Sequence, residues 1–276
     1  MYQVDDTQMV LADGSTMPRL GLGVWKLADD GPCQRAVEAA LAAGYRHVDT
    51  AQGYGNEASV GRALRASGLD RADVFVTTKF DPPRADPFEE MQGSLERLGL
   101  DYVDLYLVHW PLQSPTWAWP GMENALQAGL TRSIGVSNFS LEDLDVLLAT
   151  KSVRPVVNQV QFNPFAYRRA LLDGCESREV GVVAYSPLGM GGHLENATVV
   201  EVAERLGKSP AQILIRWALE RGAGVVPKSG DHARIRLNAE VFDFTLNEQD
   251  LKELDALDRT GLTDRAREVK FWERQG

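Results

Sequence analysis

Eight short apolar segments recur along this chain, and their recurrence limits the possible folds more than any other feature. Each segment is rich in Val, Ile, Leu or Tyr and lacks the alternation of apolar and polar residues that a half-exposed strand shows. Strands that are buried on both faces are typical of parallel sheets covered by helices. The predicted strands are residues 20–24, 46–49, 74–79, 103–109, 133–137, 156–161, 182–185 and 224–227.

Amphipathic helices are predicted between most of these strands. In residues 32–43 and 56–67 the apolar residues fall on one face at helical spacing. Gly44 and Gly68 follow two of the segments as C-terminal stops, and Ser140 and Ser209 precede two others as N-caps. The predicted helices are residues 32–43, 56–67, 87–98, 121–127, 141–148, 167–178, 197–206 and 210–220.

Four of the predicted strands end in polar residues at regular positions. Asp49, Lys79, His109 and Ser137 lie 30, 30 and 28 residues apart, close to the length of about 30 residues that one strand–helix unit takes. No linker rich in Pro, Ser or charged residues divides the series. Residues 1–276 are therefore predicted to form a single α/β domain. Eight uninterrupted units favour a closed (β/α)8 TIM barrel over an open doubly wound sheet.

Both ends of the chain add to the predicted barrel. Two short apolar pieces within residues 9–17 flank Asp13 and Gly14, which is a hairpin signal. This N-terminal β-hairpin is expected to plug the bottom of the barrel. Residues 246–271 predict a C-terminal helix followed by a polar tail, and Phe271 and Trp272 could fold over the mouth of the barrel.

The composition argues against several kinds of partner. Subtracting 39 acidic from 29 basic residues gives a net charge of −10, which opposes a broad electrostatic grip on nucleic acid or an anionic membrane. Cys33 and Cys175 show neither a disulfide framework nor a metal-ligand spacing, so no metal is expected. No apolar run approaches the ~18 residues of a membrane span, and no leader or heptad pattern is present. A cytoplasmic monomer is expected.

Neither of the common glycine-rich nucleotide motifs is present. Gly21 and Gly23 follow a predicted strand start, but the third glycine of a G-x-G-x-x-G motif is missing, and no P-loop sequence occurs. Any dinucleotide must therefore be held by a different arrangement of residues.

A ring of functional groups is predicted at one end of the barrel, because the C-terminal ends of its strands converge on one mouth. Taken singly, Asp49 could cap a turn, His109 could be a core histidine and Tyr54 could be a surface tyrosine. Lys79 closes a buried strand and needs a carboxylate partner, for which Asp49 is the nearest candidate.

Together these four residues fit a proton-transfer site. A neighbouring ammonium on Lys79 would lower the pKa of Tyr54, and Asp49 would hold Lys79 charged. A neutral His109 would donate a hydrogen bond to a carbonyl oxygen. Such a site would protonate an oxyanion while hydride reaches the adjacent carbon, and this chemistry requires no metal.

Six segments, all in the same order, resemble the signature stretches of the aldo-keto reductase superfamily. They are GYRHVDTA (44–51), YGNE (54–57), TTK (77–79), LDYVDLYLVHWP (100–111), IGVSNF (134–139) and PKS (227–229). The resemblance runs from about residue 9 to residue 257. It is closest to the bacterial branch related to 2,5-diketo-D-gluconate reductases, judged by the short loops and compact tail. It implies a barrel that binds NADPH across its mouth and reduces aldehydes or ketones to alcohols.

The resemblance implies a role for each predicted site residue. Tyr54 would be the general acid, with Asp49 and Lys79 tuning it, and His109 would orient the carbonyl group. Positions that match NADPH contacts are Gly23, Val24, Trp25, Asp49, Ser137, Asn138, Gln159, the ring-stacking Tyr185, the pyrophosphate-loop residues Ser186, Leu188 and Gly189, and the adenosine-phosphate and adenine contacts Lys228, Ser229, Arg234 and Asn238. Substrate contacts would be Trp25, Tyr54, Phe80, His109 and Trp110.

Two positions depart from the pattern of this family. Leu237 stands where the family commonly has Glu or Gln touching adenine, which loosens the expected preference for NADPH over NADH. Phe80 and Asp81 follow the catalytic lysine, where many relatives have a nearby Trp, so the shape and charge of the pocket are expected to differ. Trp117 and Trp119 would add to the aromatic wall of the mouth, although such rings could instead be core packing.

Two other functions use the same residues. A barrel of this family could bind NADPH as a regulatory or structural subunit, as the potassium-channel β-subunits do. Alternatively, Lys79 could form a Schiff base with a carbonyl compound in a lyase. The complete set of Asp49, Tyr54, Lys79 and His109 favours the reductase, because the Schiff-base hypothesis gives Tyr54 no part. The small-molecule substrate is expected to be a dicarbonyl compound or a keto sugar acid.

Overall fold

The strands of the protein are mostly shorter than the apolar segments that predict them, but they lie at the predicted places. The computed structural model describes residues 6–82, 84, 86–111, 114–150 and 153–260. Strands β1 (Gln8–Val10) and β2 (Thr16–Pro18) pair with each other. The other strands are β3 (Leu22–Gly23), β4 (His47–Asp49), β5 (Phe75–Phe80), β6 (Val103–Val108), β7 (Thr131–Ser137), β8 (Val157–Gln161), β9 (Gly181–Tyr185) and β10 (Gly224–Val225).

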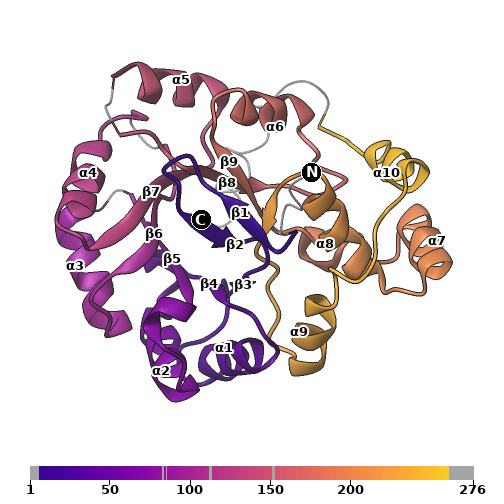
Figure 1. Ribbon diagram of the computed structural model, residues 1–276, viewed down its shortest axis with the longest axis horizontal. Helices are drawn as coiled ribbons and strands as arrows, with labels where there is room; N and C mark the ends of the chain where they lie inside the picture. Colours follow the sequence, from indigo (N-terminus) through magenta and orange to yellow (C-terminus); the bar gives the residue numbers. More distant parts are fainter. Residues whose placement is uncertain (1–5, 83, 85, 112–113, 151–152, 261–276) are drawn as a thin grey trace.

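Strands β3 to β10 form a closed ring of parallel strands, each paired with the next in chain order (Figure 1). Leu20 and Gly23 close the ring through parallel bridges to Val225 and Lys228. A Cβ at residue 23 would lie 2.7 Å from the Val226 carbonyl oxygen, so glycine is required where the first and last strands meet. The closure confirms the predicted (β/α)8 barrel.

Helices surround this ring and cover its outer face (Figure 1). Two boundaries differ from the sequence pattern: the predicted helix 167–178 begins only after Arg168, whose φ of 48° is left-handed, and the helix predicted from 121 begins earlier, with a proline near its start. The helices are α1 (Pro32–Ala42), α2 (Glu57–Ser67), α3 (Pro87–Leu98), α4 (Trp119–Gln127), α5 (Leu141–Thr150), α6 (Arg169–Glu176), α7 (Ala197–Leu206), α8 (Pro210–Glu220), α9 (His232–Ala239) and α10 (Glu248–Asp255).

The N-terminal hairpin lies across one end of the ring, as predicted (Figure 1). Met9 pairs with Met17 across the hairpin, and Gly14 adopts the left-handed φ of 84° that its turn requires. The Ser133 hydroxyl of β7 donates to the Asp13 carboxylate at 2.5 Å, which ties the turn to the start of a barrel strand. The hairpin therefore closes the bottom of the barrel, at the N-terminal ends of its strands.

The barrel interior is packed with apolar side chains. Met17 of the hairpin packs there against residues of three barrel strands, Leu105, Leu107, Val157 and Val183. A second and larger core fills the space between the sheet and the helices. Polar groups of the strands are consequently concentrated at the opposite, C-terminal mouth, where the active sites of such barrels lie.

The two remaining predictions about the ends of the chain have different outcomes. Helix α10 confirms the predicted C-terminal helix, whereas Phe271 and Trp272 lie outside the described residues. None of the helices in the described part of the chain has the length and apolar character that a membrane span requires.

A buried histidine below the mouth makes stability depend on pH. His47 is 1% exposed; its Nδ1 lies 3.3 Å from the Pro18 carbonyl oxygen and its Nε2 lies 3.0 Å from the Thr77 hydroxyl. Burial lowers the pKa of His47, and likewise that of His109, from the ordinary value of 6.5. The unfolded chain then binds more protons than the folded one as the pH falls below 6.5.

We therefore expect the free energy of unfolding to fall on acidification below pH 6.5, by up to about 1.4 kcal/mol per pH unit for each histidine. Urea unfolding at about pH 7.5 and about pH 5.5 measures this difference. The His47→Gln variant should show a smaller loss between the two pH values, whatever its absolute stability. An equal loss of unfolding free energy in both proteins would mean that His47 does not contribute to the pH dependence of stability.

Candidate active site

Four predicted catalytic residues meet at the C-terminal mouth of the barrel. Asp49 ends β4, Lys79 lies one residue before the end of β5, and His109 directly follows β6. These three strands are neighbours in the ring, so their C-terminal ends bring the three side chains together. Tyr54 is the last residue of the short 3-10 helix η1 (Gln52–Tyr54), which lies between β4 and α2.

The Lys79 ammonium is the centre of this cluster. It donates to Asp49 Oδ1 at 2.6 Å, to the Thr50 carbonyl oxygen at 2.9 Å and to the Tyr54 hydroxyl at 3.4 Å. Lys79 is fully buried and Asp49 is 3% exposed. Burial lowers the pKa of Lys79, while the Asp49 carboxylate opposes this change. Each ammonium proton has an acceptor within reach, which disfavours Lys79 as a nucleophile for a Schiff base.

Tyr54 differs from the sequence-based expectation in its acidity. We expected the ammonium of Lys79 to lower the pKa of Tyr54, but the net change of that pKa in this structure is upward. Burial raises the pKa well above its usual value, and the carboxylates of Asp49 and Asp81 raise it further. The charge of Lys79 is already paired with Asp49. The phenol therefore keeps its proton at neutral pH and is poised as a hydrogen-bond donor.

Asp49 also joins the catalytic cluster to the predicted nicotinamide contacts. Gln159 in β8 donates from Nε2 to Asp49 Oδ2 at 2.7 Å. The main-chain oxygen of Gln159 accepts from the Ser137 hydroxyl at 2.8 Å and from the Asn138 N–H at 3.0 Å. Both carboxylate oxygens of Asp49 are thus engaged, one by an ammonium and one by an amide.

Asn138 connects the two sides of the mouth. Its Nδ2 donates to the His109 carbonyl oxygen at 3.1 Å and to the Ser137 hydroxyl at 3.1 Å. Its Oδ1 accepts a hydrogen bond from the Tyr185 hydroxyl at 2.9 Å. Tyr185 ends β9 and is half-buried. Sequence reasoning placed Ser137, Asn138 and Tyr185 in one subsite, and the structure brings them into direct contact.

His109 has a carboxylate partner that the sequence analysis did not assign to the site. Its Nδ1 lies 3.2 Å from Asp81 Oδ1, and its ring meets the Tyr54 ring edge to face at 5.7 Å. Burial lowers the pKa of His109. The sequence feature that could have identified Asp81 as a site residue is the departure from the family pattern two residues after Lys79.

The predicted phosphate and adenine contacts lie on the surface beyond β9 and β10. Lys228 and Arg234 are exposed, whereas Ser229 and Asn238 are buried. Arg234 lies in the first turn of α9, where its only ion pair among the described residues is a 3.9 Å contact with Asp231. The pyrophosphate-loop residues Ser186, Leu188 and Gly189 follow β9 directly.

Gly23 and Val24 have structural roles at the predicted cofactor site. Gly23 forms the bridge that closes the barrel, and Val24 is fully buried. The Val24 carbonyl oxygen accepts from Asn56 Nδ2 at 2.9 Å, which fixes the chain before Trp25. Contact with a ligand at these two residues would therefore be made by backbone atoms.

The predicted aromatic wall is only partly formed. Trp25 and Trp110 are half-buried, and the Trp110 ring lies 5.9 Å from that of His109. Phe80 is fully buried against the Trp117 ring at 5.6 Å, and Trp119 is fully buried in α4. Phe80 and Trp119 are thus core residues in this structure and do not face the mouth.

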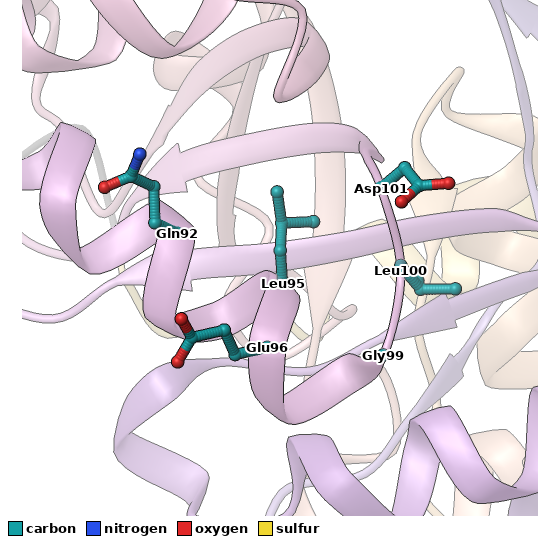
Figure 2. Close-up of a pocket in the computed structure, with 6 residues that line it drawn as sticks. All are labelled: Gln92, Leu95, Glu96, Gly99, Leu100 and Asp101. Carbon is teal, nitrogen blue, oxygen red and sulfur yellow. The ribbon is translucent and has the colours of Figure 1, made fainter.

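Two surface depressions lie away from the catalytic cluster. One of about 470 Å³ lies at the end of α3 and the turn that leads to β6, near the bottom of the barrel; Figure 2 shows its lining residues Gln92, Leu95, Glu96, Gly99, Leu100 and Asp101. Another of about 550 Å³ lies between α1 and α9. Neither contains a catalytic candidate, so the assignment of the site rests on the residues at the mouth.

Comparison with known proteins agrees with this fold. Residues 19–259 match the family model described as the aldo/keto reductase family. An aldo-keto reductase from Mycolicibacterium vanbaalenii is 46% identical over 262 residues, which cover 91% of each chain. The crystal structure of an aldo/keto reductase from Brucella melitensis has a TM-score of 0.87 and 42% identity, and the match covers 91% of this chain and 99% of that chain.

A third relative is a Bombyx mori aldo-keto reductase whose structure is a complex with NADP. It has a TM-score of 0.88 and 33% identity, and the match covers 96% of each chain. The barrel and these matches define an oxidoreductase of the NADP(H)-using kind. The chain belongs to the aldo/keto reductase family.

Proposed function

We propose that this protein is an NADPH-dependent reductase that converts aldehydes and ketones to alcohols, with Tyr54 as the general acid. The observation that carries the proposal is the chain of contacts from Asp49 through the Lys79 ammonium to the Tyr54 hydroxyl, at 2.6 and 3.4 Å. This chain lies at the mouth of the barrel beside His109, whose ring meets the Tyr54 ring edge to face at 5.7 Å.

The residues around the mouth fit a nicotinamide cofactor by the chemistry of their donors. The side chains of Ser137, Asn138 and Gln159 suit a carboxamide, and the half-buried Tyr185 offers an aromatic face. The Bombyx mori relative, in its complex with NADP, supports the same choice. Bound at these residues, NADPH would supply the hydride.

Side chains of the protein donate the proton and stabilise the charge that it leaves behind. Tyr54, protonated at rest, donates its hydroxyl proton to the carbonyl oxygen of the substrate. The phenolate that results lies beside the Lys79 ammonium at 3.4 Å, which stabilises the new negative charge. Asp49 keeps Lys79 charged and in place, and His109 orients the carbonyl group from the other side of the phenol.

The preference for NADPH over NADH is proposed to come from Lys228, Ser229 and Arg234. A phosphate monoester on the adenosine ribose would meet two exposed cations and a hydroxyl there, next to the N-terminus of α9. This local arrangement allows an acidic protein to bind a phosphorylated cofactor. The exposed Leu237 lies in the same helix and offers adenine an apolar contact.

Truncating the phosphate contact should change cofactor choice selectively. We expect Arg234→Ala and Lys228→Ala each to raise the dissociation constant for NADPH by about 10- to 100-fold, with little change for NADH. Quenching of tryptophan fluorescence during cofactor titration measures both constants. Arg236→Ala is the matched control, because Arg236 is also exposed in α9 but matches no contact. If Arg236→Ala weakened NADPH binding equally, the assignment of Lys228 and Arg234 as phosphate contacts would be contradicted.

The test of the activity itself is the consumption of NADPH with a panel of carbonyl compounds. The panel contains a 2-oxoaldehyde, an aromatic aldehyde, a diketone and a keto sugar acid, because the proposed branch of the family suggests the last. Consumption with NADPH and much less with NADH supports the proposal. Tight binding of NADPH without turnover of any member would favour a regulatory subunit instead. The expected monomeric state and cytoplasmic location stay predictions.

A further inference from the structure

One carboxylate at the mouth has no part in the proposed proton transfer. Asp81 follows β5 directly, and its side chain is 26% exposed. Its Oδ1 lies 3.2 Å from His109 Nδ1, and its charge contributes to the raised pKa of Tyr54. A negative charge therefore lies beside both groups that would hold the carbonyl oxygen of a substrate.

Hydrogen bonds and packing with neighbouring residues hold Asp81 beside His109. Its backbone N–H donates to Gln52 Oε1 at 3.1 Å, and Gln52 Nε2 is fixed in turn by the Glu90 carbonyl oxygen at 3.0 Å and the Ser94 hydroxyl at 2.9 Å. A Cβ at residue 53 would lie 2.5 Å from Asp81 Oδ2, so the carboxylate packs closely over Gly53. The loop after β5 is thus held against η1 with the carboxylate toward His109.

The charges at the mouth do not cancel. The charged groups that act most strongly on His109 are Lys79, Asp81 and Asp49. Lys79 and Asp49 form an ion pair with each other at 2.6 Å. Burial lowers the pKa of His109, which favours the neutral ring. The carboxylate of Asp81 is consequently left over, and the site carries one net negative charge. Lys26 is exposed, with its ammonium 4.4 Å from the centre of the Trp25 ring, and it is not among the groups that act most strongly on His109.

We propose that Asp81 is a specificity-determining residue, which makes the site accept neutral or cationic carbonyl compounds and reject acids whose carboxylate adjoins the reacting carbonyl group. When its carbonyl oxygen reaches Tyr54 and His109, an acid whose carboxylate adjoins the carbonyl group adds a second carboxylate to the mouth in which Asp81 already contacts His109. Like charges repel within one site, and the repulsion is strong where water is partly excluded. This inference rests on the proposed carbonyl reduction and narrows its substrates.

The test compares phenylglyoxylate with its methyl ester in the wild-type protein and in Asp81→Asn. The asparagine keeps the shape of the side chain and an oxygen that accepts from His109, so it removes only the charge. The ester-to-acid ratio of kcat/KM should fall at least about tenfold in Asp81→Asn. Intrinsic differences in reactivity between the two compounds cancel in this comparison. Glu96→Gln, which removes an exposed charge at the bottom of the barrel, should leave the ratio unchanged.

An unchanged ratio in an active Asp81→Asn protein would overturn the inference and leave the proposed function standing. A wild-type protein that reduces neither compound, nor any of the carbonyl panel, would instead refute the proposed function. In that case the effect of the Asp81 charge is measured from binding, by calorimetry with benzoate and benzamide in the presence of NADPH, whose nicotinamide ring is neutral. Wild type should bind benzamide at least about tenfold more tightly, and Asp81→Asn should reduce this preference. An equal preference in both proteins would overturn the inference without any turnover.

Discussion

Replacing Tyr54 with phenylalanine is expected to lower kcat about 100- to 10,000-fold, because the variant has no proton to give to the carbonyl oxygen. The ring remains to fill the space beside His109, and Asp49 and Lys79 keep their ion pair. The dissociation constant for NADPH should therefore stay within about twofold of the wild-type value. Steady-state kinetics with an aromatic aldehyde, together with cofactor titration, measures both quantities.

The matched control for this variant is a tyrosine outside the site. Tyr45 is buried, and its hydroxyl donates to the Ile235 carbonyl oxygen at 3.1 Å, so this hydroxyl is engaged by a helix and not by the catalytic cluster. Tyr45→Phe should lose stability on the order of 1 kcal/mol and keep kcat. Near-full activity of Tyr54→Phe would show that another group provides the proton.

Breaking the buried ion pair is expected to have the largest effect on stability. Asp49→Asn leaves the fully buried Lys79 ammonium without its carboxylate, and such a loss costs about 3–5 kcal/mol of unfolding free energy. Among the residues that the structure describes, Lys79→Met leaves the Asp49 carboxylate with the neutral Gln159 amide as its side-chain partner. Both single variants should also lose activity, because Tyr54 loses the ammonium that stabilises its phenolate.

The double variant Asp49→Asn/Lys79→Met distinguishes this ion pair from ordinary packing. It leaves no unpaired charge behind, so it should be more stable in urea unfolding than Asp49→Asn alone, although it contains one substitution more. Stability losses that simply add up in the double variant would contradict the account. Activity should not return, since neither group remains to act on Tyr54.

Much of the fold follows from the sequence because its signals are local and periodic. The apolar segments at about 30-residue intervals fix the strand–helix units, and residues such as Ser209, whose hydroxyl forms a capping box with Gln212, fix helix ends. The polar residues that end β4, β5 and β6 predict the catalytic cluster, because neighbouring parallel strands end at one mouth.

The aromatic wall shows where residue type misled the prediction. Phe80 directly follows Lys79 on β5, so its side chain points to the opposite face of the sheet. Lys79 faces the mouth and Phe80 faces the helices, where it meets Trp117. The alternation of side chains along a strand predicts this arrangement. The prediction of a substrate contact relied instead on Phe80 being an aromatic residue beside a catalytic lysine.

The acidity of Tyr54 could not be predicted from sequence, because it depends on burial and on contacts between distant segments. The ammonium of Lys79 is near enough to stabilise a phenolate, but Asp49 already balances its charge. Asp81 adds a second carboxylate through a loop whose position is set by Gln52. The link from Gln159 to Asp49 likewise joins residues 110 positions apart.

The central claim is that Tyr54 protonates a carbonyl oxygen while the adjacent carbon receives hydride. The most direct measurement uses NADPH with both hydrogens of its hydride-donating carbon replaced by deuterium, and follows the label into the alcohol by mass spectrometry. The account predicts one deuterium in each alcohol molecule formed by the wild-type protein, and almost no alcohol from Tyr54→Phe with the cofactor still bound. Labelled alcohol formed by Tyr54→Phe at the wild-type rate, or no alcohol from the wild-type protein with any carbonyl compound of the panel, would contradict it.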